Sequence, residues 1–300
     1  MEFARLTPGP GFAPVQSLLY YGQRVVTSPH LRRFVIASLR SGVRLRHGSA
    51  GSGNELDAHE AATVRRLSAD GYAPLPSLLS AAQVADIHAF LRPKRLKARL
   101  GGSHGFTLDD VPEGTRIADY ELKDIIDAPH ILALANSPAL LRMASQYVGC
   151  KPTISALGLR WSFPSASVGS DVQAFHRDSD DWRYMKVLVY LTDVDDGAGP
   201  HVYVQGTHLT KASARLRHYS DADIADKYGA SRTIVATGNA GFGFTVDTSG
   251  IHKGAVPTRT ARLMLQIQYS ILPAYAYRYA PQRYRGSLAL DPYINRLFCS

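Results

Sequence analysis

The stretch FHRDSDDWRYMKVLVYLTDVDDGAGPHVYVQGTH, residues 175–208, holds the pattern that decides the fold of this chain. It opens with His176 and Asp178, which are two residues apart. Side chains two apart on a strand project to the same face, so an imidazole nitrogen and a carboxylate oxygen can share a cation there. The apolar segment 186–192 follows and predicts a buried strand. Because a His-x-Asp pair is common by chance, it needs support from elsewhere in the sequence.

A second histidine gives that support. His252 lies in GFGFTVDTSGIHKGAVP, directly after another predicted strand. Two histidines and one carboxylate leave half of an octahedral shell open, which suits a non-haem Fe(II) that must also bind a cosubstrate and dioxygen. Zinc more often takes tetrahedral ligands that include cysteine or a third histidine. The pattern therefore favours an Fe(II) site formed by His176, Asp178 and His252.

An arginine beyond these residues offers a site for an anion. Arg262 opens the predicted strand RLMLQIQY and could hold a distal carboxylate through two parallel hydrogen bonds. Arg259 is the alternative, although its place in the turn VPTRTA is typical of a solvated loop residue. We expect Arg262 to be the cofactor-binding residue.

Weaker candidates surround this set. Arg160 could face the cavity and meet a carboxylate of a cosubstrate or substrate, or it could form a surface ion pair. Lys186 and Tyr190 are four apart on one strand and share a face, so Lys186 is a candidate cofactor-binding residue and Tyr190 a candidate substrate-pocket residue, although we favour core or rim positions for both. Trp182 follows the metal stretch and could stack on a substrate.

The order of predicted elements indicates the fold class. Helical spacing and capping signals precede residue 150, whereas short segments rich in β-branched and aromatic residues follow it. The predicted helices are 55–67, 81–91 and 129–148, and the predicted strands are 72–75, 153–163, 186–192, 201–204, 232–236, 243–246 and 262–269. Helices followed by strands predict an α+β fold, mainly β in its core, whose strands pack as a sandwich or barrel.

Composition narrows the class of protein. Apolar residues make up 45% and charged residues 20% of the 300 residues, a globular balance that excludes a disordered chain or a coiled coil. Two cysteines, Cys150 and Cys299, cannot form a disulfide framework, and the first residues do not resemble a secretory signal, so we expect a cytoplasmic protein. No apolar run is long enough to predict a membrane span.

The net charge of +9 is concentrated near the beginning of the chain. Residues 1–50 hold seven arginines and one acid, so a nucleic-acid partner is not expected for the main body. We predict a basic N-terminal extension and linker over 1–54, the main domain over 55–272 and a Tyr/Arg-rich tail over 273–300. The extension could be helical with a basic face, but we favour a loosely packed segment, and we favour a tail strapped across the body.

Taken together, the sequence resembles the phytanoyl-CoA dioxygenase family of Fe(II)/2-oxoglutarate oxygenases over about residues 60–272. DGYAPLPSLLSAAQV (70–84) is similar to the family's N-terminal signature, and the metal stretch ends in a similar Gly-Thr-His motif that includes His208. The histidine of that motif is structural in the family, so we count neither His201 nor His208 as a ligand. Gly254 departs from the pattern, because many members carry a hydroxyl there beside the cosubstrate carboxylate.

The resemblance implies a double-stranded β-helix, a cupin-like jelly roll, with flanking helices and with iron between its two sheets. It implies His176, Asp178 and His252 as metal ligands and Arg262 as the anchor of 2-oxoglutarate. The implied reaction consumes dioxygen and hydroxylates an unactivated C–H of a small organic substrate, namely a lipid, an amino-acid derivative or a secondary metabolite, with release of succinate and CO2.

Other outcomes stay open. Desaturation or cyclisation could occur on the same iron centre, and a non-catalytic jelly-roll protein that binds metal or ligand is a further alternative. Halogenation is disfavoured, because Asp178 fills the coordination position that chloride would need. The sequence does not fix the substrate or the oligomeric state.

Overall fold

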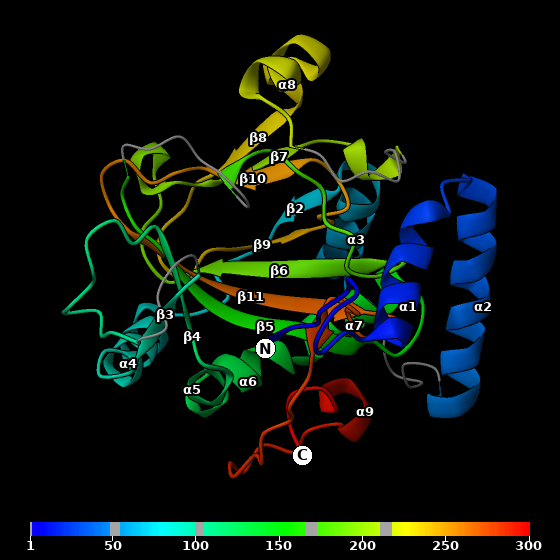
Figure 1. Cartoon of the computed structure of the whole chain (residues 1–300), viewed down its shortest axis with the longest axis horizontal. Coiled ribbons are helices and arrows are strands. Elements are labelled where there is room, and N and C mark those ends of the chain that lie inside the picture. Colours follow the sequence, from blue (N-terminus) through cyan, green and yellow to red (C-terminus); the bar gives the residue numbers. More distant parts are fainter. Residues whose placement is uncertain (1, 49–54, 100–104, 166–172, 211–217) are drawn as a thin grey trace.

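Two antiparallel sheets form the centre of the computed structural model, which describes residues 2–48, 55–99, 105–165, 173–210 and 218–300 (Figure 1). Within these residues the large sheet has the strand order β2-β9-β6-β11-β5-β4-β3 and the small sheet the order β10-β7-β8. The strands of the large sheet are β2 (Tyr72–Pro74), β3 (Leu96–Ala98), β4 (Ile117–Tyr120), β5 (Thr153–Ser162), β6 (Tyr184–Tyr190), β9 (Gly243–Val246) and β11 (Arg262–Ser270). Those of the small sheet are β7 (His201–Val204), β8 (Thr233–Ala236) and β10 (His252–Gly254).

The two faces of the large sheet differ because successive side chains of a strand point to opposite sides. On β11, the fully buried Leu263, Leu265 and Ile267 belong to the main hydrophobic core, whereas Met264 and Gln266 line a cavity on the other side. The sequence thus fixes which face packs on helices and which face is available to a ligand.

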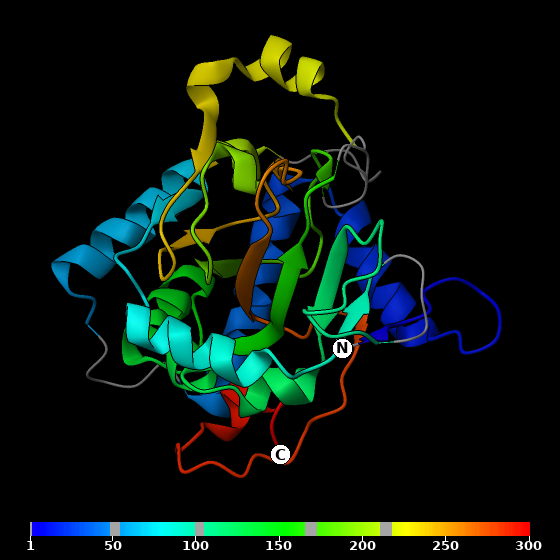
Figure 2. The same cartoon turned by 90° about the vertical axis from the view of Figure 1, so that its left-hand side faces the viewer.

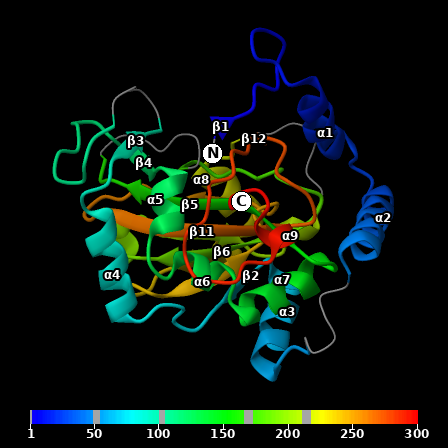
Figure 3. The ribbon, with the colours of Figure 1, turned by 90° about the horizontal axis from the view of Figure 1, so that it is seen from below.

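Helices cover the apolar face of the large sheet (Figure 3). These are α3 (Ala58–Asp70), α4 (Ala81–Leu91), α5 (Leu122–Asp127), α6 (Ile131–Ala135), α7 (Pro138–Val148) and α9 (Pro292–Asn295). A further helix, α8 (Asp221–Tyr228), stands apart beyond the small sheet (Figure 2), and short 3-10 turns lie at η2 (Asp196–Ala198), η3 (Thr207–Leu209) and η4 (Ala230–Arg232). None of the described helices combines the length and apolar character that crossing a membrane requires.

Local signals place most helix ends where the sequence predicts them. Ser80 and Gln83 form the reciprocal capping box that begins α4, and Gly71 ends α3 in the left-handed conformation. The single helix predicted over 129–148 is wrong, since the structure divides it into α6 and α7. Pro138 opens α7, and proline cannot continue a preceding helix because it lacks the N–H and its ring clashes with the previous turn.

The N-terminal segment differs from the loosely packed extension that we favoured. It forms β1 (Glu2–Phe3), α1 (Pro14–Val25) and α2 (Pro29–His47), which is the helical alternative. Two polar side chains tie these helices to the body, because Gln23 Nε2 donates to Ser179 O at 2.9 Å and Arg40 Nε donates to Val148 O at 2.6 Å. Gln23 and Arg40 are polar residues that could have faced solvent, but here they bind backbone carbonyls of the body. The domain boundaries at residues 54 and 272 stay a prediction.

The two ends of the chain meet. β1 pairs antiparallel with β12 (Tyr277–Arg278), and the C-terminal segment runs across the body (Figure 3). The Tyr279 hydroxyl connects the C-terminal segment to β5 by donating a hydrogen bond to Ser155 O at 2.7 Å.

The close approach of α3 to the small sheet gives a test of the fold. Gly71 has a φ of +79°, and a Cβ there would overlap the Tyr203 hydroxyl and the His208 ring. Gly114 has a nearly identical φ of +78° with open space around it. We expect Gly114→Ala to lower the free energy of unfolding by about 1 kcal/mol through backbone strain alone. Gly71→Ala should add an overpacking cost of about 1–3 kcal/mol. Urea denaturation of both variants checks this, and equal losses would contradict the proposed contact.

Candidate metal centre

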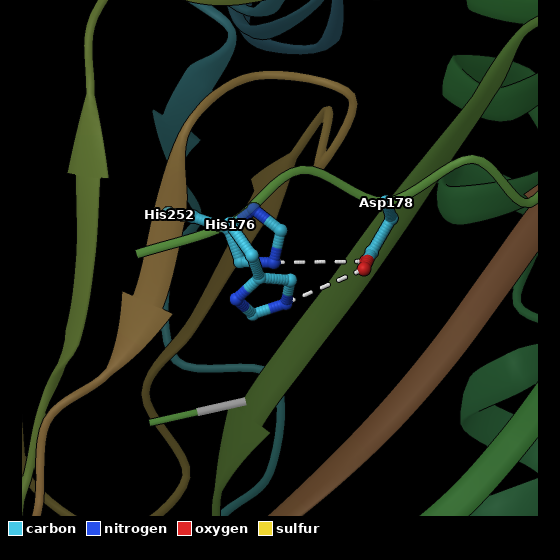
Figure 4. A group of neighbouring side chains, drawn as sticks. All are labelled: His176, Asp178 and His252. Carbon is cyan, nitrogen blue, oxygen red and sulfur yellow. Dashed lines mark ion pairs between the residues drawn. The ribbon is translucent and has the colours of Figure 1, made fainter. Parts of the chain in front are cut away.

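The structure brings the three predicted ligands together (Figure 4). His176, Asp178 and His252 each offer one ligand atom, and these atoms all lie within 4.8 Å of one another. His176 Nε2 is 3.4 Å from Asp178 Oδ1, and His252 Nε2 is 3.6 Å from Asp178 Oδ2. Adjacent corners of an octahedral shell with bonds of about 2.1 Å are about 3 Å apart, so the three groups are spaced like ligands of one ion.

Backbone pairing produces this arrangement. His176 and His252 form an antiparallel bridge in which each N–H donates to the other's carbonyl, at 2.9 and 3.0 Å. The Asp178 N–H donates to Thr248 O at 2.8 Å and continues the pairing. Two segments far apart in the sequence are therefore held side by side by backbone bonds, and Arg177 Nη1 adds a side-chain bond to Ser249 O at 2.8 Å.

Both imidazole rings are oriented by their second nitrogen. Nδ1 of His176 bonds to Ala174 O at 2.8 Å, and Nδ1 of His252 bonds to Gly250 O at 3.0 Å. A carbonyl accepts only from a protonated nitrogen, so each Nδ1 carries the hydrogen and each Nε2 keeps its lone pair. Such carbonyl partners are typical of metal-binding histidines.

The electrostatic environment keeps two of the three groups, His252 and Asp178, in the protonation states that a metal needs. Burial, aided by the neighbouring His176, lowers the pKa of His252 to about 3, so this ring stays neutral. Burial alone would raise the pKa of Asp178, but Lys186, His252 and His176 together hold it well below its usual value. A metal ligand must be a neutral imidazole or an ionised carboxylate, and His252 and Asp178 meet this condition. Burial would lower the pKa of His176, but the hydrogen bond and the charge of Asp178 raise it above its usual value, so metal binding there displaces a proton more readily at higher pH.

Lys186 lies against the carboxylate ligand. Its buried Nζ donates to Asp178 Oδ2 at 2.6 Å and is 3.0 Å from Asp180 Oδ2. Burial would lower the pKa of Lys186, but the two carboxylates raise it above its usual value. Lys186 lines the cavity that contains the three ligands. Its ammonium is already bound to Asp178 and Asp180.

Arg262 is buried at the beginning of β11 and lines the cavity. Its Nη1 donates to Gly199 O and its Nη2 to Ser162 Oγ at 3.3 Å, whereas its Nε has no partner among the described residues. Gly254 faces this guanidinium, since a Cβ there would lie 3.1 Å from Nη2. The absence of a hydroxyl at Gly254 therefore leaves room for the arginine.

Three weaker candidates occupy other positions. Arg160 lines the cavity but forms the alternative ion pair, with Nε 2.7 Å and Nη2 3.1 Å from the carboxylate of Asp119. Tyr190 and Trp182 lie outside the residues that line the cavity. The Tyr190 hydroxyl is buried and donates to Ala236 O at 2.7 Å. Trp182 lies under the guanidinium of Arg32, 5.1 Å from its ring centre, so the N-terminal helices cover its predicted stacking face.

Arg259, His208 and His201 are not among the predicted anchor and ligand residues, and they lie in three different environments. Arg259 is exposed and pairs with Asp195 at 2.7 Å. His208 bonds to Ser68 O at 3.1 Å, which suits a structural residue. His201 lines the cavity with its ring stacked 5.4 Å from that of His252, and burial lowers its pKa well below the usual range.

A cavity of about 240 Å³ connects the cluster with Arg262. Phe3, Gly158, Gln173, Gln266 and Tyr277 are among the lining residues that sequence reasoning missed. Gln266 could have been found, because it is two alternations from Arg262 on one strand. Phe3 and Tyr277 carry no local signal, since only the pairing of the two chain ends brings them there.

The model of the phytanoyl-CoA dioxygenase (PhyH) family matches residues 67–255. The chain belongs to this family. The predicted resemblance is confirmed, and with it the enzyme class: the protein is an Fe(II)- and 2-oxoglutarate-dependent oxygenase. The chemistry of the donor set agrees with this cofactor, because two neutral nitrogens and one carboxylate converge on one point.

Solved structures show the same fold. EctD from S. alaskensis, in complex with 2-oxoglutarate and 5-hydroxyectoine, aligns with a TM-score of 0.52 at 18% identity, over 84% of this chain and 91% of that chain. The non-heme alpha-ketoglutarate-dependent carbocyclase SnoK from nogalamycin biosynthesis aligns with a TM-score of 0.52 at 18% identity, over 73% and 86% of the two chains. The predicted jelly roll is thereby confirmed. No curated protein matches the chain.

Replacing each of two neighbouring acids, Asp178 and Asp180, in separate variants tests the ligand set. Asp178→Ala removes the anionic ligand, so Fe(II) affinity should fall by more than the roughly 10–100-fold that loss of a supporting residue costs. Asp180→Asn keeps all three ligands and removes only one carboxylate partner of Lys186, so its effect should stay within that range. Anaerobic calorimetric titration with Fe(II) measures both, and equal affinities in the two variants would exclude Asp178 as a ligand.

A second pair of variants, Arg262→Ala and Arg259→Ala, tests the proposed 2-oxoglutarate anchor. Arg262→Ala should weaken 2-oxoglutarate binding by about 2–5 kcal/mol, because a buried charge-assisted partner is lost, while Fe(II) affinity is retained. Arg259→Ala alters an exposed ion pair and should have little effect. Titration of 2-oxoglutarate into the Fe(II)-loaded variants gives both values, and the reverse order would make Arg259 the anchor.

Proposed function

We propose that this chain hydroxylates an unactivated C–H of a small organic substrate. The observation that carries the proposal is a single cavity lined by His176, Asp178, His252 and Arg262. The ligand atoms converge from one side, so open coordination positions face the cavity, where a cosubstrate and a substrate can reach them. A protein that only binds metal does not need a buried arginine in the same cavity.

When bound, iron with 2-oxoglutarate and dioxygen supplies an oxidant able to attack a C–H bond, with succinate and CO2 as coproducts. The protein supplies positions. His176 and His252 present their Nε2 atoms, Asp178 adds the negative charge, and Lys186 holds one carboxylate oxygen and so restricts rotation of that ligand.

Arg262 would bind the distal carboxylate of 2-oxoglutarate with its buried guanidinium, assisted by the Ser162 hydroxyl. Leu188 and Met264 line the same cavity and give it apolar walls. Because apolar walls lower the local dielectric constant, the charged cosubstrate interacts more strongly with Arg262. The same walls keep water away from the reacting centre.

Hydroxylation fits better than the other reactions of this iron class. Asp178 occupies the position that a halide would need, which disfavours halogenation. Carbocyclisation and epimerisation are carried out by SnoK and SnoN, which are described as alpha-ketoglutarate dependent, so cyclisation and desaturation are kept as outcomes of the test.

We also propose that the protein works on a small molecule in the cytoplasm and does not bind nucleic acid. Cys150 and Cys299 are free thiols, which suits a reducing compartment. The excess of arginine in residues 1–50 belongs to segments that pack on the body.

Screening candidate substrates for Fe(II)-dependent succinate release tests the proposal. With a competent substrate, the product should contain one oxygen atom from isotopically labelled dioxygen and no halogen, even in buffer containing chloride. A product with two hydrogens fewer and no added oxygen would instead indicate desaturation or cyclisation. Succinate release that persists unchanged in Asp178→Ala would contradict the assigned site.

A further inference from the structure

The cavity extends past the metal cluster along the large sheet. Gln266 is four residues along β11 from Arg262, about 13 Å in a strand, and it pairs in register with Gly158 on β5. Both residues line the cavity, so this distal part, between Gln266 and the chain ends, lies away from the proposed 2-oxoglutarate anchor. Its side chains define what can bind next to the iron.

The charged side chains that line the distal part already have partners. They form the ion pairs Lys186–Asp178, Lys186–Asp180 and Arg160–Asp119, and Arg99 lies 5.8 Å from the ring centre of Phe3 with further contacts. A charged substrate would have to compete with these pairs, and at the buried Lys186 this would leave a carboxylate uncompensated.

The neutral polar groups, in contrast, have hydrogen-bonding capacity to offer. Gln173 is 5% exposed, and its Oε1 accepts from Arg116 Nη2 at 2.6 Å while its Nε2 makes no hydrogen bond among the described residues. The half-buried Gln266 and Tyr277 also line the cavity and can present an amide and a hydroxyl to an occupant. Buried polar groups are rarely left unsatisfied, so the Gln173 amide indicates a hydrogen bond with an occupant.

The chain ends form the outer wall. Phe3 and Tyr277 are paired in the two-stranded ribbon β1–β12, with ring centres 5.2 Å apart. Gln16 Nε2 donates to Tyr277 O at 3.0 Å and ties the ribbon to α1. Two aromatic rings thus line the cavity from segments that lie 274 residues apart in the sequence, with Phe3, which is 65% exposed, at the rim.

The floor of the distal part is Gly158. A Cβ at this position would meet nothing within 4 Å, so the glycine leaves open space in the sheet surface. The whole cavity is about 240 Å³, below the roughly 300–1,000 Å³ of typical ligand pockets, and 2-oxoglutarate would take part of it. The space that remains suits a compact molecule.

We propose that the distal part binds a small uncharged polar substrate, one that carries carbonyl, amide or hydroxyl groups on a compact apolar skeleton. It lies over Gly158 and under the rings of Phe3 and Tyr277, with hydrogen bonds to the two glutamine amides. An acyl-CoA thioester is not the substrate that we propose, since the cavity is small and its cations Lys186 and Arg160 are already paired with carboxylates. The inference rests on the proposed function and names its substrate class.

Four probes of matched size and different charge test the class. δ-Valerolactam and cyclohexane-1,2-diol are neutral, whereas piperidine is a cation and cyclohexanecarboxylate an anion; octanoyl-CoA is added as a thioester. Each is titrated calorimetrically, without oxygen, into the full chain loaded with Fe(II) and 2-oxoglutarate. The neutral probes should bind at least tenfold more tightly than the charged ones and the thioester.

Two variants locate the binding. Gly158→Leu fills the open floor and should weaken binding of δ-valerolactam at least tenfold, and Gln266→Leu should weaken it severalfold. Gly42→Leu is the matched control, because a Cβ on this exposed residue of α2 also meets open space but lies outside the cavity lining. It should leave binding unchanged.

The result is separable from the proposed function. The visible band of the Fe(II)–2-oxoglutarate complex reports on the metal centre and on folding in every variant, and its absence in the wild type would count against the oxygenase site itself. With that band present, tighter binding of a charged probe or of octanoyl-CoA would overturn the inference. So would undetectable binding of both neutral probes, or a Gly158→Leu protein that binds δ-valerolactam normally.

Discussion

The two backbone hydrogen bonds between His176 and His252 are the constraint on which the site depends. They join the segment before β6 to the beginning of β10, and β10 pairs in turn with β7 of the small sheet. Both histidines are thereby held at one register, and Asp178 follows through its own bond to Thr248 O. A slip of one residue in this pairing would turn the side chains to the opposite face. The sheet register therefore determines whether the three ligands can meet.

Charge balance explains why so many ionisable groups can be buried there. Lys186 lies between Asp178 and Asp180, which leaves one negative charge without compensation in the buried cluster. A cation at the three ligand atoms would neutralise it and relieve the repulsion between the carboxylates. Farther along the cavity, Arg160 and Asp119 neutralise each other, so the walls there present mainly neutral hydrogen-bonding groups. Anions and cations are thus concentrated where the metal and the cosubstrate are proposed to bind.

Local signals predicted most of the fold and the centre of the site. The cap at Ser80 and the alternating strands depend on neighbouring residues, so the sequence alone located them. The break at Pro138 was missed because apolar spacing continues through it, although the proline itself signals a helix start. Trp182 was predicted to stack on a substrate, but Arg32 of α2 lies over its ring. This contact was missed because we expected that segment to pack loosely. Phe3 and Tyr277 could not be predicted, since their place in the cavity follows from pairing between the chain ends.

The central claim is that His176, Asp178 and His252 hold one Fe(II) that 2-oxoglutarate can chelate. Anaerobic titration of the full chain with Fe(II) and 2-oxoglutarate, followed by visible absorption, tests it most directly. The account predicts a weak charge-transfer band that saturates at one Fe(II) per chain and that appears only when both components are present. No band at saturating concentrations, or a band that is unchanged when His252 is replaced by alanine, would contradict it.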